Sequence, residues 1–173
     1  MARWGRRVSG ALASVLLLMG FALTASMAGQ EAADRGAPAN SIQVVVNGVV
    51  TKTWTADQLM RRRFDWANAK GKFRPAVALT EVLSIKDAGF TLDSLTELKV
   101  LSRRESVTLR GEALTRVKDL VLQIEVDKGG TWKLAPRNRE AEGALRKLVG
   151  PRIAVEGVRR VEVVTGPAPG TKN

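Results

Sequence analysis

Ile42-Gln-Val-Val-Val-Asn-Gly-Val-Val-Thr-Lys-Thr-Trp54 is the stretch of sequence that decides the fold. Two runs rich in β-branched residues flank Asn47-Gly48, and this dipeptide suits the two positive φ angles of a type I′ turn. The spacing therefore predicts a β-hairpin in which Ile42, Val44 and Val46 share one face. The pairs expected across it are Val46 with Val49 and Val44 with Thr51.

Short helices and further strands are predicted after the hairpin. Thr55-Ala-Asp-Gln58 has the spacing of a capping box and predicts a helix that begins at Ala56 and turns Leu59 and Met60 inward. Other helical segments are expected at 80–88, 91–95, 111–118 and around 141–148, where Ala141, Ala144, Leu145 and Leu148 follow helical spacing. Strands are expected at 98–102, 106–110, 120–126, 131–135, 153–155 and 158–164. The fold class is α+β, with short helices on one mainly antiparallel or mixed sheet.

The basic and aromatic segment from Trp66 to Arg74 has two interpretations. Aromatic residues interleaved with basic ones can bind single-stranded nucleic acid through stacking and phosphate contacts. The interpretation that we favour from the sequence is a solvated loop whose aromatic side chains lie under the core.

The first thirty residues indicate export. Arg3, Arg6 and Arg7 precede an uncharged run from 8 to 30 that contains Ser26-Met27-Ala28, and this pattern predicts a signal peptide cleaved after Ala28. The alternative is an uncleaved N-terminal anchor, because the run is about long enough to span a bilayer. We expect a periplasmic or secreted bacterial protein with four segments: a signal peptide at 1–28, a flexible leader at 29–40, one globular domain at 41–165 and a flexible tail at 166–173. No later segment of the sequence resembles a membrane span.

The charge and the missing residue types narrow the function. The formal net charge is +11, which favours anionic partners such as nucleic acid, lipid headgroups, acidic polymers or phosphorylated small molecules. The chain has no Cys and no His, which excludes disulfides, thiolate and imidazole catalysis and the usual zinc, copper and haem sites. We therefore expect a non-catalytic protein. Glycoside chemistry would need two converging carboxylates, for which the candidates are Asp57, Asp65, Glu81 and Asp87.

Several short pieces of the sequence, taken in order, resemble a known family. They are Val44–Val50, Thr55–Leu59, Gly71–Leu83, Ala88-Gly89, Gly150-Pro-Arg152 and Val158–Val163. This layout resembles the exported molybdopterin-binding domain of the sulfite-oxidase type and covers most of 42–164. The resemblance implies a sulfite-oxidase-like fold. Only this resemblance implies molybdopterin as a cofactor.

The chain departs from that family at its redox centre. It lacks the cysteine whose sulfur holds molybdenum and the histidines that often help to hold the pterin. The resemblance therefore implies a member without the metal, and Arg152 is the position carried over as a contact for a phosphate or another anion. The alternative interpretation of Arg152 is an exposed arginine at the start of a strand.

Three functions follow as hypotheses. The first is an exported, non-catalytic binding domain that recognises an anionic small molecule or a partner protein. The second is a basic envelope-associated protein that binds acidic polymers, nucleic acid among them, or anionic lipid. Its patch would comprise Arg61, Arg62, Arg63, Lys70, Lys72 and Arg74, although bases at the end of a helix also stabilise the helix. The third is an oxidoreductase subunit whose metal site is completed by a partner.

Overall fold

The computed structural model describes residues 40–67, 71–85, 87, 89–125 and 128–166. These residues belong to one compact unit, which spans Pro38–Asn173. The predicted signal peptide, its cleavage site after Ala28, residues 29–39 of the leader and residues 167–173 of the tail lie outside the described residues.

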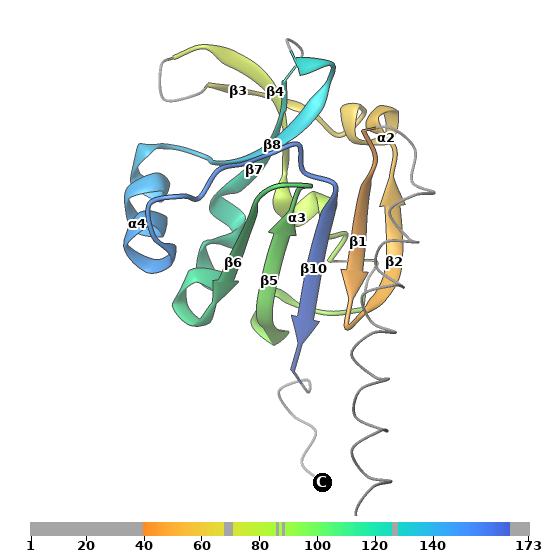
Figure 1. Cartoon of the computed structure of the whole chain (residues 1–173), viewed down its shortest axis with the longest axis vertical. Helices are drawn as coiled ribbons and strands as arrows, with labels where there is room; N and C mark the ends of the chain where they lie inside the picture. Colours follow the sequence, from red (N-terminus) through yellow and green to blue (C-terminus); the bar gives the residue numbers. More distant parts are fainter. Residues whose placement is uncertain (1–39, 68–70, 86, 88, 126–127, 167–173) are drawn as a thin grey trace, which may run out of the picture. The chain divides into compact units, whose positions relative to one another are not determined.

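The first sheet has five strands in the order β2-β1-β10-β5-β6 (Figure 1). Strands β1 (Ile42–Val46) and β10 (Arg160–Thr165) are parallel, and every other neighbouring pair in this sheet is antiparallel. The remaining strands are β2 (Val49–Trp54), β5 (Leu95–Leu101) and β6 (Ser106–Arg110). Strand β10 therefore lies in the middle of the sheet.

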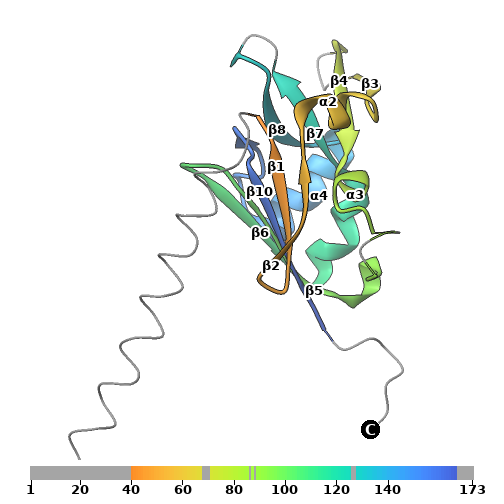
Figure 2. The ribbon, with the colours of Figure 1, turned by 90° about the vertical axis from the view of Figure 1, so that its right-hand side faces the viewer.

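The second sheet is antiparallel throughout, in the order β3-β4-β7-β8-β9. Its strands are β3 (Phe64–Ala67), β4 (Phe73–Ala78), β7 (Leu120–Glu125), β8 (Thr131–Pro136) and β9 (Val155–Glu156). Figure 2 shows β3, β4, β7 and β8 above the long strands of the first sheet. The chain passes from the second sheet to the first through residues 157–159, and Gly157 there has a φ of 69°.

Short helices fill the space behind the first sheet. They are α2 (Ala56–Met60), α3 (Leu79–Val82), the 3-10 segments η1 (Leu92–Ser94) and η2 (Gly111–Asp119), and α4 (Arg139–Val149). Segment η2 contacts β5, β6, β7, α3 and α4, so it joins the two sheets. One continuous apolar core results, which includes Leu98 and Val161 of the first sheet and Leu122 and Leu134 of the second.

The α+β class is confirmed, but the strands form two sheets where one was predicted. The predicted hairpin is present as β1 and β2, with φ angles of 50° at Asn47 and 84° at Gly48. Val46 pairs with Val49 as expected, whereas Val44 pairs with Lys52 because the register shifts between Val44 and Val45. The capping box between Thr55 and Gln58 is also confirmed.

The loop prediction is wrong at both ends of the stretch, because Trp66 lies in β3 and Arg74 in β4, and these two strands pair as a hairpin. Trp66 pairs with Arg74, and Trp66 is buried against Ala76 and Val121. Pro75 is tolerated because β4 pairs with β7 only from Ala76 onward, so the missing N–H of Pro75 interrupts no bond to β7.

Two helix predictions also need correction. The helix expected over 80–88 is α3, which ends at Val82, since Ser84 takes a positive φ of 47° that no helix allows. Helix α4 buries Ala141 and Leu145 as predicted, but Leu148 is 39% exposed.

Candidate functional site

A hollow of about 390 Å³ lies where the second sheet meets the turn between β5 and β6. We call it the arginine hollow, and its defining residues are Arg103, Arg104, Glu125, Lys128, Glu156 and Arg159. The volume is at the lower end of the range of about 300–1,000 Å³ that is usual for small-molecule sites. The hollow is therefore large enough for a small ligand.

The turn that carries Arg103 and Arg104 is held by Ser102. The Ser102 hydroxyl accepts hydrogen bonds from the backbone N–H groups of Arg104, at 3.2 Å, and Glu105, at 3.0 Å. The Ser102 N–H also donates to the Glu105 carbonyl at 2.9 Å. Glu105 then accepts the Glu156 N–H on its carboxylate at 3.2 Å, which fastens the turn to strand β9 of the second sheet. The two arginines thus project from a fixed turn.

Arg159 reaches the same hollow from the connection between β9 and β10. Its N–H donates to the Leu101 carbonyl at 2.9 Å, and its carbonyl accepts the Gln43 N–H at 2.8 Å. Because Arg160 pairs with Leu101 in the sheet, Arg159 lies beside the first residues of the β5–β6 turn. Strand pairing therefore brings together arginines that are more than fifty positions apart in the sequence.

The three guanidinium groups have no ion-pair partner among the residues that the structure describes. The nearby lysines differ, because Lys128 and Lys133 both bond to Glu156, at 2.6 and 2.9 Å. The hydrogen bond from Lys128, followed by that from Lys133, lowers the pKa of Glu156 to about 2. The Glu156 hydrogen bond in turn raises the pKa of Lys128. The arginines thus remain available to an anion from outside the chain.

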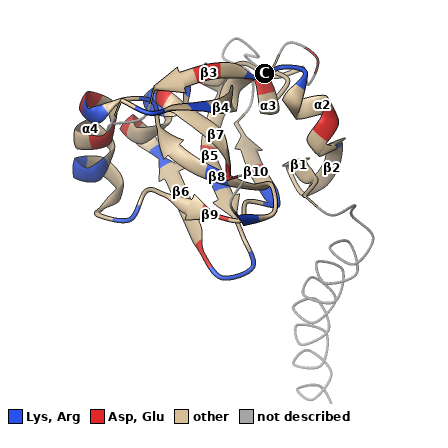
Figure 3. Cartoon of the chain, turned by 90° about the horizontal axis from the view of Figure 1, so that it is seen from above, with Lys and Arg blue, Asp and Glu red and all other residues tan. Residues whose placement is uncertain are grey.

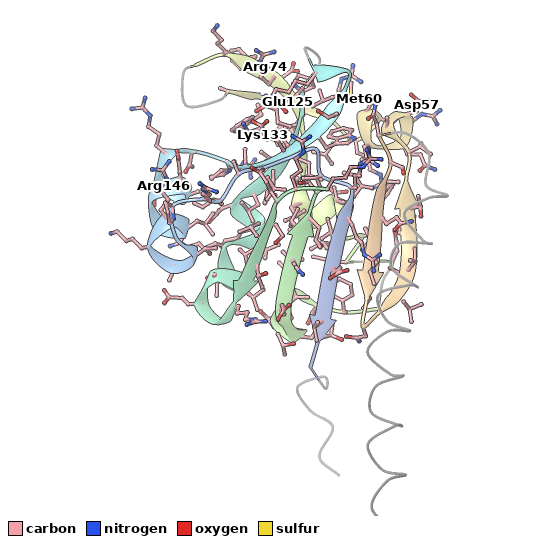
Figure 4. The ribbon with its side chains drawn as sticks, viewed as in Figure 1. Asp57, Met60, Arg74, Glu125, Lys133 and Arg146 are labelled. Carbon is pink, nitrogen blue, oxygen red and sulfur yellow. The ribbon has the colours of Figure 1, made fainter. Side chains whose placement is uncertain are left out.

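A second hollow, of about 450 Å³, lies on the outer face of the second sheet. We call it the sheet groove, and the strand register sets its lining. Trp66, Arg74, Gln123 and Lys133 lie on one face because β3, β4, β7 and β8 pair them in adjacent rows. Figure 4 places Glu125 and Lys133 between the β3–β4 hairpin, which carries Arg74, and the first sheet. The groove is polar, in contrast to the opposite face with Leu122 and Leu134.

Arg152 lies at the surface just before β9 and does not line the arginine hollow. It borders a separate hollow of about 320 Å³ whose charged lining also includes Glu105, Glu142 and Arg146. Arg146 already bonds to Glu142 at 2.6 Å. Arg152 is the position that the sequence resemblance selected. The hollow beside it shares one lining residue, Glu105, with the arginine hollow.

The residues of the predicted basic patch occupy two different places. Lys72 and Arg74 line the sheet groove. Arg61, Arg62 and Arg63 follow α2, where Arg62 bonds to Glu81 at 3.1 Å and lies over the Trp54 ring, and Arg63 donates to the Met60 carbonyl at 2.9 Å. Lys70 lies outside the described residues. Figure 3 shows blue and red segments interspersed around α2 and along the β3–β4 hairpin.

The carboxylates considered for glycoside chemistry do not line the hollows described above. Asp57 lies in the first turn of α2, Asp65 is exposed on β3, and Asp87 follows α3. The fourth carboxylate, Glu81, is the partner of Arg62.

The arginine hollow could not be located from the sequence. Arg103 and Arg104 read as a turn between strands, and Arg159 as the start of a strand. The usable signal was that all three arginines lie next to one end of an apolar strand pattern, Arg103 and Arg104 after β5 and Arg159 before β10. The pairing of β5 with β10, which unites them, joins segments that are distant in the sequence.

The donor atoms of this chain do not fit a molybdenum centre, since it has neither a thiol nor an imidazole. Within the described ranges, no group of three Asp or Glu residues is arranged to hold a metal ion. No helix in the same part of the chain combines the length and apolar composition needed to cross a membrane. Comparison with family models, with curated proteins and with solved structures found no match to this chain.

Proposed function

We propose that this chain is an exported, non-catalytic binding domain that recognises an anionic small molecule in the arginine hollow. The observation that carries the proposal is that Arg103, Arg104 and Arg159 line one hollow without an ion-pair partner among the described residues. Guanidinium groups bind phosphate and carboxylate oxygens in pairs of parallel hydrogen bonds, so three of them suit a phosphate or a polycarboxylate. The predicted signal peptide at 1–28 supports export, and the absence of Cys and His supports recognition over catalysis.

We also propose that the fold is of the sulfite-oxidase-like type. Its support is the ordered sequence resemblance over 42–164 together with the α+β architecture. An experimental structure with molybdopterin or a simpler pterin added would test this, because the family proposal requires the pterin to bind in a hollow of this unit.

Thermal unfolding in the presence of ligands tests the binding proposal. A ligand that binds only the folded protein stabilises it by about 2.7 kcal/mol at a hundred times its Kd. Pyrophosphate, alkyl phosphates, citrate and pterins form a suitable panel. We expect at least one anion to raise the Tm in a saturable manner, and a panel without any such anion would overturn the proposal.

Two variants with equal charge changes localise the binding. Arg103→Gln/Arg104→Gln removes two cations from the arginine hollow, and Arg61→Gln/Arg63→Gln removes two from the end of α2. The first variant should lose the ligand-dependent rise in Tm and the second should keep it. The opposite result would favour the basic envelope-associated protein, whose binding to DNA or anionic vesicles should also fall steeply with salt.

A further inference from the structure

The arginine hollow and the sheet groove border each other along one row of paired residues. Glu156 of β9 pairs with Lys133 of β8, and Lys133 pairs with Gln123 of β7. Glu156 lines the arginine hollow, whereas Lys133 and Gln123 line the sheet groove. Because Lys133 Nζ bonds to Glu156 Oε1 at 2.9 Å, this ion pair joins the two linings. The two hollows are therefore neighbours.

The boundary between the two hollows is accessible and carries more positive than negative charge. The Glu156 side chain is 47% exposed, the Lys128 side chain 53% and the Lys133 side chain 27%. Both lysines bond to the one carboxylate, so two cations share a single anion there. A negatively charged ligand can thus continue from the arginine hollow across this boundary without meeting a surplus of its own charge.

Positive charge also exceeds negative charge over the two linings together. In the part of the chain that the structure describes, the acidic residues of these linings are Glu105, Glu125, Glu142 and Glu156. The basic residues are Lys72, Arg74, Arg103, Arg104, Lys128, Lys133 and Arg159. A surplus that extends over neighbouring hollows favours a ligand with several negative charges in a row.

The spacing of the strands sets the length of such a ligand. The row that begins at Glu156 continues through Lys133 and Gln123 to Ala76 of β4. Three strand spacings cover about 14 Å. Arg74 lies two residues before Ala76 on the same strand and lines the groove. Pyrophosphate is too short for this span, whereas a longer chain of phosphate groups can cover it.

The aromatic residues of the two hollows do not suit the bases of a nucleic acid. Trp132 lines the arginine hollow and Trp66 the sheet groove, but they are only 1% and 8% exposed. Proteins that bind single-stranded nucleic acid stack the bases on accessible rings. These linings therefore offer charge without a stacking surface, which favours a polyanion that has no aromatic groups.

We propose that the anion in the arginine hollow is one unit of an unbranched chain of phosphate groups, which crosses β8 and β7 and enters the sheet groove. This inference rests on the proposed function and extends its ligand. The arginines bind the first phosphates through paired hydrogen bonds. Lys72 and Arg74 then attract the phosphates that follow, and each added contact is intramolecular once the first unit is bound.

Phosphate chains of increasing length, titrated by calorimetry at one salt concentration, test the proposal. The ligands are pyrophosphate, tripolyphosphate and a linear polyphosphate long enough to span about 14 Å. The longest should bind at least about tenfold more tightly than pyrophosphate. Lys72→Gln/Arg74→Gln should weaken binding of the longest chain about tenfold and change the pyrophosphate affinity by less than about twofold. The unchanged pyrophosphate affinity would also show that this variant is folded.

The control variant is Arg61→Gln/Arg63→Gln, which removes the same charge from residues outside both linings. It should keep both affinities, and an equal loss of chain binding would show diffuse attraction and exclude the proposed path. If pyrophosphate binds but the longer chain gains nothing, or if Lys72→Gln/Arg74→Gln binds the chain like the wild type, anion recognition in the arginine hollow stands and the chain is excluded. If no phosphate of any length binds, the chain is excluded together with phosphate as the ligand of the arginine hollow.

An oligothymidylate with the same number of phosphates distinguishes a nucleic acid from a simple phosphate chain. We expect it to bind more weakly than the polyphosphate, because its bases find no ring on which to stack. Tighter binding of the oligothymidylate would overturn the proposal in favour of a nucleic acid.

Discussion

Asn47 and Thr165, which are 118 positions apart, exchange two hydrogen bonds. Asn47 Nδ2 donates to Thr165 Oγ1 at 2.9 Å, and the Thr165 N–H donates to Asn47 Oδ1 at 3.0 Å. One side chain thus serves two purposes: it adopts the positive φ of the type I′ turn and fastens the end of β10 beside β1.

Replacing Asn47 separates these two purposes. Asn47→Gly keeps the positive φ but removes both hydrogen bonds, and we expect it to lower the free energy of unfolding by about 1–2 kcal/mol, measured by urea denaturation. Asn47→Asp retains the acceptor for the Thr165 N–H and should lose about half as much. A glycine variant as stable as the wild type would show that the bonds contribute nothing.

Helix α4 offers two leucines of opposite burial for one comparison. Leu145 is fully buried, and Leu145→Ala should cost about 2–5 kcal/mol because it leaves a cavity in the core. Leu148→Ala, at a position 39% exposed, should change stability by less than about 1 kcal/mol. Equal losses in chemical denaturation would contradict the orientation of the helix.

The two lysines around Glu156 predict a specific pH dependence. The pKa of Glu156 falls from 4.5 to about 2 because Lys128 and Lys133 bond to its charged form. The folded protein thus binds that proton more weakly than the unfolded chain, so the stabilisation is complete above about pH 4.5 and is lost as the pH falls toward 2. An NMR titration of the Glu156 carboxyl carbon should have its midpoint near 2.

Substitution provides the control for that titration. Glu156→Gln should reduce the loss of stability between these two pH values, whereas Glu112→Gln, at an exposed residue of η2, should leave the profile unchanged. Because 47% of the Glu156 side chain is exposed, the stabilisation that the two lysines provide through Glu156 should be small and should decrease as the salt concentration rises. A carboxyl midpoint near 4.5 would show that the lysines do not act on it.

Metal content distinguishes the binding domain from an oxidoreductase subunit. We expect protein purified alone from its own host to contain no stoichiometric molybdenum, as measured by mass spectrometry of the element, because the chain has no soft ligand. Molybdenum that copurifies only when a second polypeptide is present would favour the third hypothesis, an oxidoreductase subunit whose metal site is completed by a partner.

Local sequence signals predicted the elements that depend on local physics. Asn47-Gly48 and Thr55–Gln58 each fix a conformation within four residues, and both predictions are confirmed. The β3–β4 hairpin was missed because Trp66 and Arg74 lie opposite each other in a stretch that has the composition of a loop. Its place in the second sheet depends on β7, more than forty residues later in the sequence.

The site was less predictable than the fold. Arg103 and Arg104 gain their significance from Arg159, and the three meet only because β5 pairs with β10. Whether a surface arginine already has a carboxylate partner depends on tertiary geometry. Arg62, which is paired with Glu81, and Arg103, which has no such partner among the described residues, look equivalent in the sequence.

The central position of β10 has a consequence for the order in which the chain can fold. Strands β1 and β5 each pair with β10, so neither can take its final neighbours until residues 160–165 have left the ribosome. Pairing between such distant segments is slow, because closing a long loop costs chain entropy before any stabilising contact has formed. The proposed export would require an unfolded polypeptide, and the late pairing of β10 leaves the first sheet incomplete until synthesis has reached residue 165.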